Sequence, residues 1–189
     1  MFFLQTTNSS KAHLEKEINR LIDLYGQDVL RTAYMYLKDL QKAEDVFQEV
    51  FIRVFRKYET FQGRSSEKSW ITRITINLCK DVLRSAWLKR ALLTDKPVEE
   101  ELPQEGESLE SRVAQDAEDK LLFSEVMNLK TEFKDVILLY YYHGYDTKEI
   151  SEILKVKEGT VRSRLHRARQ ILKERLEGRV DFGDADERF

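Results

Sequence analysis

The sequence predicts an all-α protein made of two small helical domains that a flexible acidic linker joins. Apolar residues recur at the 3.6-residue spacing of helices, only two prolines and seven glycines occur in 189 residues, and charge is segregated along the chain. A chain of this length, 41% hydrophobic, can bury one moderate core or two small ones. Two helical domains of fewer than about 100 residues each fit this composition best.

Charge and periodicity together set the expected boundaries. Helical spacing predicts a first domain over residues 14–90, with a break near the glycine at position 26, and a second domain over residues 119–178. Residues 1–13 show little periodicity and are expected to form a mobile arm. Residues 91–118 carry nine acidic and two basic residues with two prolines, so an extended or disordered linker is expected. The acidic residues 179–189 are expected to form a loose tail.

The composition argues against several classes of protein. Cys79 is the only cysteine, which excludes an intramolecular disulfide framework and leaves no cysteine cluster for zinc. No cofactor or metal is therefore expected. No apolar run approaches the roughly 18 residues of a membrane-spanning helix, and the N-terminus lacks the pattern of a secretory signal. These observations predict a cytoplasmic protein.

Residues 146–176 predict two short helices joined by a tight turn. The carboxylate of Asp146 can accept the amide of Glu149, whose side chain can reach back in a variant of the capping box. After a four-residue break, apolar residues recur at helical spacing from Val161 onward. Residues 157–179 contain eight Lys or Arg against three Asp or Glu, a local charge of +5 in a chain of −2. This combination is typical of a DNA-binding helix-turn-helix.

The outward face of the second helix is polar and basic. Its centre can reach base edges in a major groove, its flanking arginines can reach the phosphates on either side, and Gly159 lets the backbone come close. An ordinary amphipathic helix with a solvated basic face is the alternative, but the capped first helix, short turn and glycine together favour DNA. The predicted DNA-facing residues are Thr160, Arg162, Ser163, Arg164, His166, Arg167 and Arg169.

The segment EGTVRSRLHRAR, Glu158–Arg169, resembles the promoter-reading helix of the alternative sigma factors of bacterial RNA polymerase, in particular the extracytoplasmic-function (ECF) group. The resemblance covers residues 17–176. It implies that this helix reads the minus-thirty-five promoter element and that the protein is not an enzyme and has no small-molecule substrate. Two positions depart from the family pattern: Lys155 stands where a turn glycine is frequent, and Lys130 where a proline is frequent.

A helix predicted over residues 40–58 has an unusual outward face. Ala43, Phe47, Val50, Phe51 and Val54 are its expected core positions. On physical grounds alone, the opposite face is most simply solvated. The segment AEDVFQEVFIRVF, residues 43–55, however resembles the family's polymerase-binding helix, which docks on the clamp coiled coil of the β′ subunit. The residues implied to contact core polymerase are Asp45, Gln48, Glu49 and Ile52.

The next helix carries a polar stripe at spacings of four, three and four residues, which would track a phosphate backbone: Arg73, Asn77, Lys80 and Arg84. Asn77 and Asp81 lean toward the expected core side, so hydrogen bonding to a neighbouring helix or to Arg84 is an equal alternative for them. Trp70 is expected to pack in the core.

The segment SxxxWITRITINLCKDVLRS, residues 66–85, resembles the family's reader of the minus-ten element. In such proteins the preceding loop holds a base turned out of the non-template strand, which requires polar edges and an apolar wall. The residues expected to form this pocket are Phe61, Gln62, Arg64 and Ser65.

The leading hypothesis is an ECF-type sigma factor. The implied partners are core RNA polymerase, through the β′ clamp coiled coil and the β flap, promoter DNA, and an anti-sigma factor that is often membrane-bound. The alternative is a helix-turn-helix regulator of the response-regulator or repressor type, which leaves the patterns at residues 43–55 and 66–85 unexplained. A nuclease is disfavoured because no convincing metal-ligand cluster is present.

Overall fold

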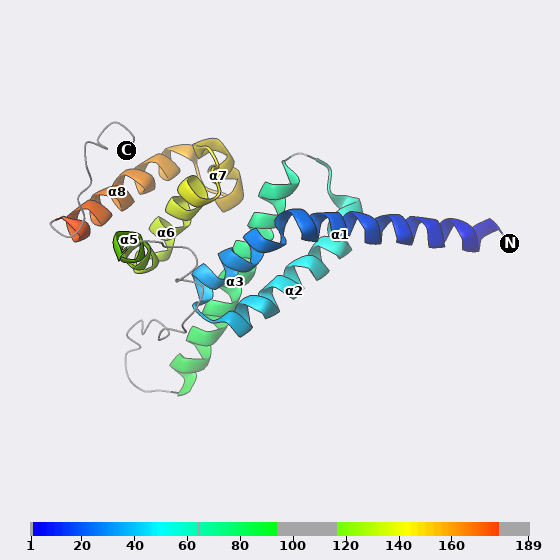
Figure 1. The fold of residues 1–189 in the computed structure, drawn as a ribbon, viewed down its shortest axis with the longest axis horizontal. Helices are drawn as coiled ribbons and strands as arrows, with labels where there is room; N and C mark the ends of the chain where they lie inside the picture. Colours follow the sequence, from blue (N-terminus) through cyan, green and yellow to red (C-terminus); the bar gives the residue numbers. More distant parts are fainter. Residues whose placement is uncertain (1, 64, 94–116, 178–189) are drawn as a thin grey trace. The chain divides into compact units, whose positions relative to one another are not determined.

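The computed structural model describes residues 2–63, 65–93 and 117–177, with side chains for residues 12–63, 65–88 and 120–177, and every regular element that it describes is helical (Figure 1). The chain divides into two compact units, Met1–Gly106 and Glu107–Phe189. The prediction of an all-α protein with two helical parts is confirmed. Most of the predicted linker and the whole predicted tail lie outside the described residues.

The first unit is built from α1 (Phe2–Leu37), α2 (Leu40–Lys57), the 3₁₀ turn η1 (Tyr58–Thr60) and α3 (Glu67–Leu93). Each of the three long helices packs against the other two, and α1 crosses both α2 and α3 (Figure 1). Their shared core is formed mainly by apolar side chains, and the removal of these side chains from water is the main stabilising contribution to such a small unit. Its fully buried members include Leu21, Val50, Val54 and Ile71.

Helix α1 differs from the sequence expectation near Gly26. It runs without interruption through Gly26, so the predicted break there is wrong. Gly26 is buried, and a Cβ on it would lie 3.3 Å from Cε2 of Phe47 on α2. The glycine therefore permits a close approach between two helices. The helix also begins at Phe2, so the backbone of the segment predicted as a mobile arm is helical.

Helix α2 begins where the sequence predicted, after Asp39, whose side chain accepts a hydrogen bond from the Lys42 amide at 3.1 Å. Four of its five expected core residues are buried. The exception is Phe47, which is half-buried with its ring centroid 5.0 Å from that of Phe51, and Val46 takes its place in the core. A small rotation of the helix relative to the expected apolar stripe accounts for this difference.

The second unit contains α5 (Ala117–Met127), α6 (Thr131–Ile137), the π-helical turn η2 (Leu138–Tyr142), α7 (Thr147–Leu154) and α8 (Glu158–Leu176). Helix α8 packs against α5, α6 and α7. Gly144, two residues after the last residue of η2, has a φ of +72°, a left-handed conformation typical of the residue that ends a helical run. The fully buried side chains of this core include Leu139, Ile150, Val161 and Leu176.

The turn between α7 and α8 holds Lys155 in the left-handed region, with φ 55° and ψ 45°. A side chain in this region strains the backbone, whereas glycine adopts it freely. We therefore expect Lys155→Gly to raise the free energy of unfolding by about 0.5–1 kcal/mol, because the relieved strain exceeds the added entropy of the unfolded chain. Urea unfolding measures this change. Lys155→Ala removes the same side chain but keeps a Cβ, and equal stabilities of the two variants would contradict the expectation.

Candidate nucleic-acid and polymerase interfaces

The helix-turn-helix forms as the sequence predicted. The Glu149 amide donates to Oδ1 of Asp146 at 2.8 Å, and the Asp146 amide donates to Oε2 of Glu149 at 3.0 Å, which completes the capping box. The apolar stripe of α8 is buried against the rest of the unit, so its opposite face is turned outward. The buried residues of that stripe are Val161, Leu165, Ala168, Leu172 and Leu176.

Glu158 ties the two helices of this motif together. Its Oε1 accepts hydrogen bonds from Oγ1 of Thr147 at 2.7 Å and from Nη2 of Arg162 at 2.6 Å. These two hydrogen bonds, that of Thr147 foremost, lower the pKa of the Glu158 carboxyl. The first residue of α8 is thus joined to the first residue of α7, a role that the sequence analysis did not assign.

The seven predicted DNA-facing residues form two groups. Arg162, Ser163, His166 and Arg167 are exposed, whereas Thr160, Arg164 and Arg169 are half-buried. The two half-buried arginines contact α6 and η2. Nη2 of Arg164 lies 3.0 Å from Oε2 of Glu132, and Nε of Arg169 donates to the Tyr141 hydroxyl at 2.9 Å.

Anchoring of the flanking arginines leaves the four exposed residues as the centre of the outward face of α8. We call them the groove surface: Arg162, Ser163, His166 and Arg167. Beside them, Gly159 is exposed, and a Cβ added to it would meet nothing within 4 Å. The start of α8 therefore offers both side chains and an open backbone to a ligand.

The four residues predicted to contact polymerase all lie on the outward side of α2. We call them the docking surface: Asp45, Gln48, Glu49 and Ile52. Asp45 and Gln48 are exposed, Ile52 is 43% exposed, and half-buried Glu49 accepts from Nε of Arg53 at 2.8 Å. An isoleucine thus stands in water among acidic and amide side chains, as the sequence predicted.

The loop between η1 and α3 brings aromatic and polar groups together. The ring centroids of Phe61 and Trp70 are 4.7 Å apart and the rings stack at 25°, while Trp70 is only 8% exposed and packs in the core as predicted. Ser66 caps α3 by accepting from the Ser69 amide at 3.1 Å. Gln62 is exposed and Ser65 half-buried; Arg64, also expected in this pocket, lies outside the described residues.

The polar stripe on α3 faces outward. Arg73 and Lys80 are half-buried, and Asn77 and Arg84 are exposed. The expectation that Asn77 and Asp81 lean toward the core is wrong, because both are exposed, although Asp81 does pair with Arg84 at 3.9 Å. Beside its large apolar residues, the core side of α3 carries small side chains that the sequence analysis did not place there: Thr72, Thr75 and Cys79.

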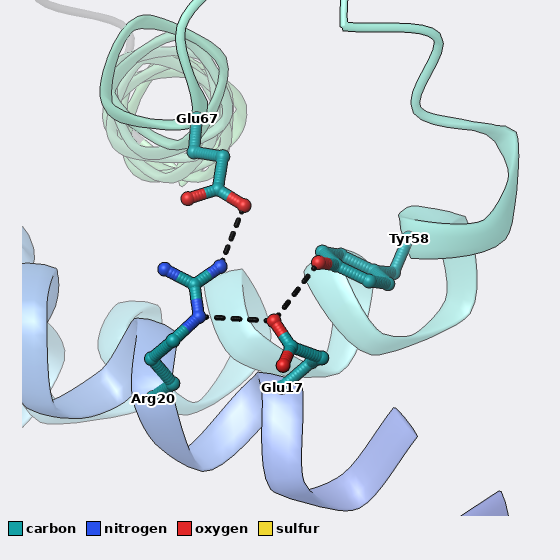
Figure 2. Close-up of polar contacts among 4 residues, drawn as sticks. All are labelled: Glu17, Arg20, Tyr58 and Glu67. Carbon is teal, nitrogen blue, oxygen red and sulfur yellow. Dashed lines mark hydrogen bonds and ion pairs between the residues drawn. The ribbon is translucent and has the colours of Figure 1, made fainter. Parts of the chain in front are cut away.

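A polar cluster that the sequence analysis missed joins α1 to both ends of this loop (Figure 2). Arg20 donates from Nε to Oε2 of Glu17 at 2.9 Å and from Nη2 to Oε1 of Glu67 at 2.7 Å. The Tyr58 hydroxyl donates to the same Oε2 of Glu17 at 3.3 Å. The hydrogen bond from Arg20 lowers the pKa of Glu17, and the hydrogen bond to Glu67 is the main reason that the pKa of Arg20 is raised.

The lowered pKa of Glu17 predicts a dependence of stability on pH. A carboxylate with a lowered pKa stabilises the fold fully above its unfolded value of 4.5 and loses that contribution as the pH falls through the folded pKa. Glu17→Gln should therefore lower the melting temperature slightly at neutral pH, because ion pairs of this exposure contribute little, and should make no difference in acid. Thermal unfolding at a series of pH values measures this. In an Arg20→Met background the pH-dependent part should be much reduced, and an unchanged profile there would show that Arg20 is not its cause.

Comparison with known families identifies the class of protein. The family model for Sigma-70 region 2 matches residues 21–89, which include α2 and most of α3. The family model for Sigma-70, region 4 matches residues 125–172, which include the helix-turn-helix. The chain therefore belongs to the sigma-70 family of bacterial RNA polymerase sigma factors.

Relatives narrow this assignment to the extracytoplasmic-function group. The chain is 30% identical to the ECF RNA polymerase sigma factor SigW of Bacillus subtilis, over 82% of this chain and 87% of SigW. It is 28% identical to SigX of the same organism over 87% of this chain and 86% of SigX. It is 36% identical to SigE of Mycolicibacterium smegmatis over 84% of this chain and 61% of that relative. The protein is thus an ECF sigma factor, a non-enzymatic factor that directs RNA polymerase to initiate transcription at specific promoters.

Solved structures share the fold at lower identity. The sigma factor RpoE, in its complex with the anti-sigma factor NepR from Bartonella quintana, superposes with a TM-score of 0.65 at 20% identity, over 87% of this chain and 99% of that one. CnrH, in complex with the cytosolic domain of CnrY, gives a TM-score of 0.62 at 20% identity, over 88% of this chain and 91% of that one.

Membership of the sigma-70 family excludes the alternative of a response-regulator or repressor.

No described helix is long and apolar enough to cross a membrane. No group of three or more His, Cys, Asp or Glu in the described part of the chain is arranged to hold a metal ion.

Proposed function

We propose that this ECF sigma factor divides its work among three surfaces. The groove surface of α8 reads the minus-thirty-five element, α3 and its preceding loop capture the minus-ten element, and the docking surface of α2 binds core polymerase. The observation that carries this proposal is the exposure of Arg162, Ser163, His166 and Arg167 on the face of α8 opposite its buried stripe.

The groove surface has the chemistry of a major-groove reader. Arg167 and His166 at its centre are suited to the acceptors of guanine, and Ser163 can pair with either a donor or an acceptor. Arg164 and Arg169 are held at the flanks by Glu132 and Tyr141, where their charges suit phosphates rather than bases. Base contacts would set promoter choice, whereas phosphate contacts would add affinity that salt reduces.

The first unit has the parts needed to hold an unstacked base. Phe61 is fixed by its stack on Trp70 and supplies an apolar wall, and Gln62 and Ser65 supply polar edges. Arg64 is assigned to the same pocket from its sequence alone. Beyond the loop, the outward stripe of Arg73, Asn77, Lys80 and Arg84 would follow the phosphates of the captured strand.

The docking surface suits a helical partner. One exposed apolar side chain, Ile52, is surrounded by Asp45, Gln48 and Glu49, a mixture that a helix laid against another helix can use. We assign this partner as the clamp coiled coil of β′, and assign the β flap to the second unit. These assignments follow from family membership and from the exposure of the four side chains.

We also propose that an anti-sigma factor covers the polymerase-binding faces of this protein in the cytoplasm and that a membrane-bound form of it would hold the protein near the membrane. The structural neighbours RpoE and CnrH were each solved in complex with a partner, which for RpoE is named as an anti-sigma factor. An exposed isoleucine within a polar surface is a suitable anchor for such a competitor.

Run-off transcription tests the proposed function. Purified protein and core polymerase lacking its own sigma factor are incubated with a library of genomic fragments, and discrete transcripts that require the added protein are expected. A promoter found in this way then serves as a duplex probe. The protein should bind this duplex weakly by itself and tightly with core polymerase, whereas tight binding without polymerase would contradict the proposal.

A further inference from the structure

The cluster of Glu17, Arg20, Tyr58 and Glu67 lies outside every surface assigned above, yet it connects to one of them (Figure 2). Tyr58 is the first residue of η1, and Glu67 is the first residue of α3. The loop with the proposed base pocket lies between them. The two residues that bound this segment are thus held by a single turn of α1.

The geometry makes Arg20 the centre of this cluster. Its guanidinium donates through two different nitrogens, to Glu17 at 2.9 Å and to Glu67 at 2.7 Å, and Glu17 in turn accepts from Tyr58 at 3.3 Å. A planar guanidinium presents donors on separate nitrogens, so it can make both contacts at once in a fixed geometry. Arg20 and Glu67 are 47 residues apart in sequence, so the contact fixes the start of α3 against α1.

The cluster also balances charge beside the loop. Glu17 and Glu67 are half-buried, with side-chain exposures of 22% and 26%, and Arg20 is the cation paired with both. Without Arg20, both carboxylates would lose the cation with which they pair, next to a loop that is to receive an anionic strand. The Glu67 carboxylate would remain favourable at the start of α3, but its contact with Arg20 of α1 would be gone.

We propose that Arg20 is a positioning residue for minus-ten recognition: it touches no DNA itself and fixes the two ends of the loop so that its pocket is formed before the base arrives. This inference rests on the proposed function of the loop. Preorganisation increases affinity by removing the entropy cost of ordering a loop on binding. Ion pairs of this exposure contribute little to global stability, so the effect should be local.

The test uses holoenzyme reconstituted from core polymerase and full-length protein. Two fragments of the promoter identified above serve as probes: a fork with duplex upstream and a single non-template strand over the minus-ten element, and the same fragment without that strand. The ratio of the two affinities measures the contribution of the single strand. Arg20→Met removes the guanidinium and keeps the apolar stem, and Arg31→Met removes an exposed arginine elsewhere on α1 as the matched control.

We expect Arg20→Met to reduce the single-strand contribution about tenfold, which corresponds to about 1.4 kcal/mol, and to leave binding of the strandless fragment unchanged. Glu67→Gln should also reduce the single-strand contribution. The double variant, Arg20→Met with Glu67→Gln, should reduce it no more than the larger single effect, because both substitutions break the same contact between Arg20 and Glu67. Arg20→Lys should be intermediate, since one ammonium cannot reproduce the two-nitrogen contact. Amides of the described loop residues, 61–63 and 65–66, should exchange hydrogen faster in Arg20→Met.

The outcomes separate this inference from the proposed function. If wild-type holoenzyme gains no affinity from the single strand, the proposed role of the loop fails, and the inference fails with it. If the wild type gains affinity and Gln62→Ala reduces it, but Arg20→Met does not, only the inference is overturned. If Arg20→Met weakens both probes equally, its role is general stability, which also overturns the inference.

Discussion

Replacing Arg167 with Ala is expected to reduce transcription from the cognate promoter by about five- to 150-fold, because one good base contact contributes about 1–3 kcal/mol of discrimination. Arg167 is exposed at the centre of the groove surface, and its Nη1 donates a hydrogen bond to Oε1 of Gln170 at 3.2 Å on the same helix. Its loss should therefore leave the fold and core-polymerase binding intact. Run-off transcription and a polymerase pull-down measure the two properties separately.

Lys173→Ala is the matched control for Arg167→Ala. It removes one positive charge from an exposed position on the same helix but on a different face. The control should reduce transcription far less, and mainly in a way that depends on salt. Unchanged transcription by the Arg167 variant, or equal losses from the two variants, would refute a base-reading role for Arg167.

Replacing Ile52 with Asp is expected to impair binding to core polymerase, the property that Arg167→Ala should leave intact. An apolar residue at the centre of an interface can contribute 2 kcal/mol or more, so binding to core polymerase should weaken by at least about 30-fold. Ile52 is 43% exposed, so the stability of the free protein should change by no more than about 0.5 kcal/mol. In the absence of polymerase, the variant and the wild type should bind the minus-thirty-five duplex with the same weak affinity.

Ile52→Leu provides the control, because it keeps an apolar side chain of the same size at the same position. It should retain most of the binding, whereas Ile52→Asp should not. Competition between labelled and unlabelled protein for core polymerase gives both affinities. If Ile52→Asp bound core polymerase as tightly as the wild type, the proposed role of the docking surface would be refuted.

Local features of this protein were predictable from its sequence. The capping box of Asp146 and Glu149 depends on residues three apart, and the exposure of Ile52 and Arg167 follows from helical periodicity within single helices. The outward faces of α2 and α8 were therefore predictable from sequence, although three of the seven residues predicted on α8 are half-buried. The family resemblance, and not the periodicity, suggested what these faces bind, namely promoter DNA and core polymerase.

Features that depend on packing between helices were not predictable. Gly26 was expected to break α1, but the helix continues through it, and its missing side chain leaves room for Phe47 on α2. Thr75 is 1% exposed and donates its hydroxyl to the Ile71 carbonyl at 2.9 Å, so a polar residue occupies a core position without a buried unpaired group. An apolar pattern does not detect such a residue, which is why Asn77 and Asp81 were placed too near the core.

Side-chain contacts between distant residues were missed for the same reason. Arg20 meets Glu67, and Arg169 meets Tyr141 across 28 residues, and no spacing rule connects such pairs. These contacts divide the predicted arginines of α8 into anchored and outward groups and form the cluster beside the loop between η1 and α3. The structure thus adds the positions of residues that support the proposed DNA-binding surfaces.

A footprint on the promoter selected by run-off transcription tests the central claim most directly, namely that two helical units read one promoter at two separate places. Hydroxyl-radical cleavage of the holoenzyme complex should show one protected segment upstream and another downstream, and thymines should react with permanganate only in the downstream segment. Arg167→Ala should remove the upstream protection first. A single protected segment, or an identical footprint from the protein without core polymerase, would contradict the account.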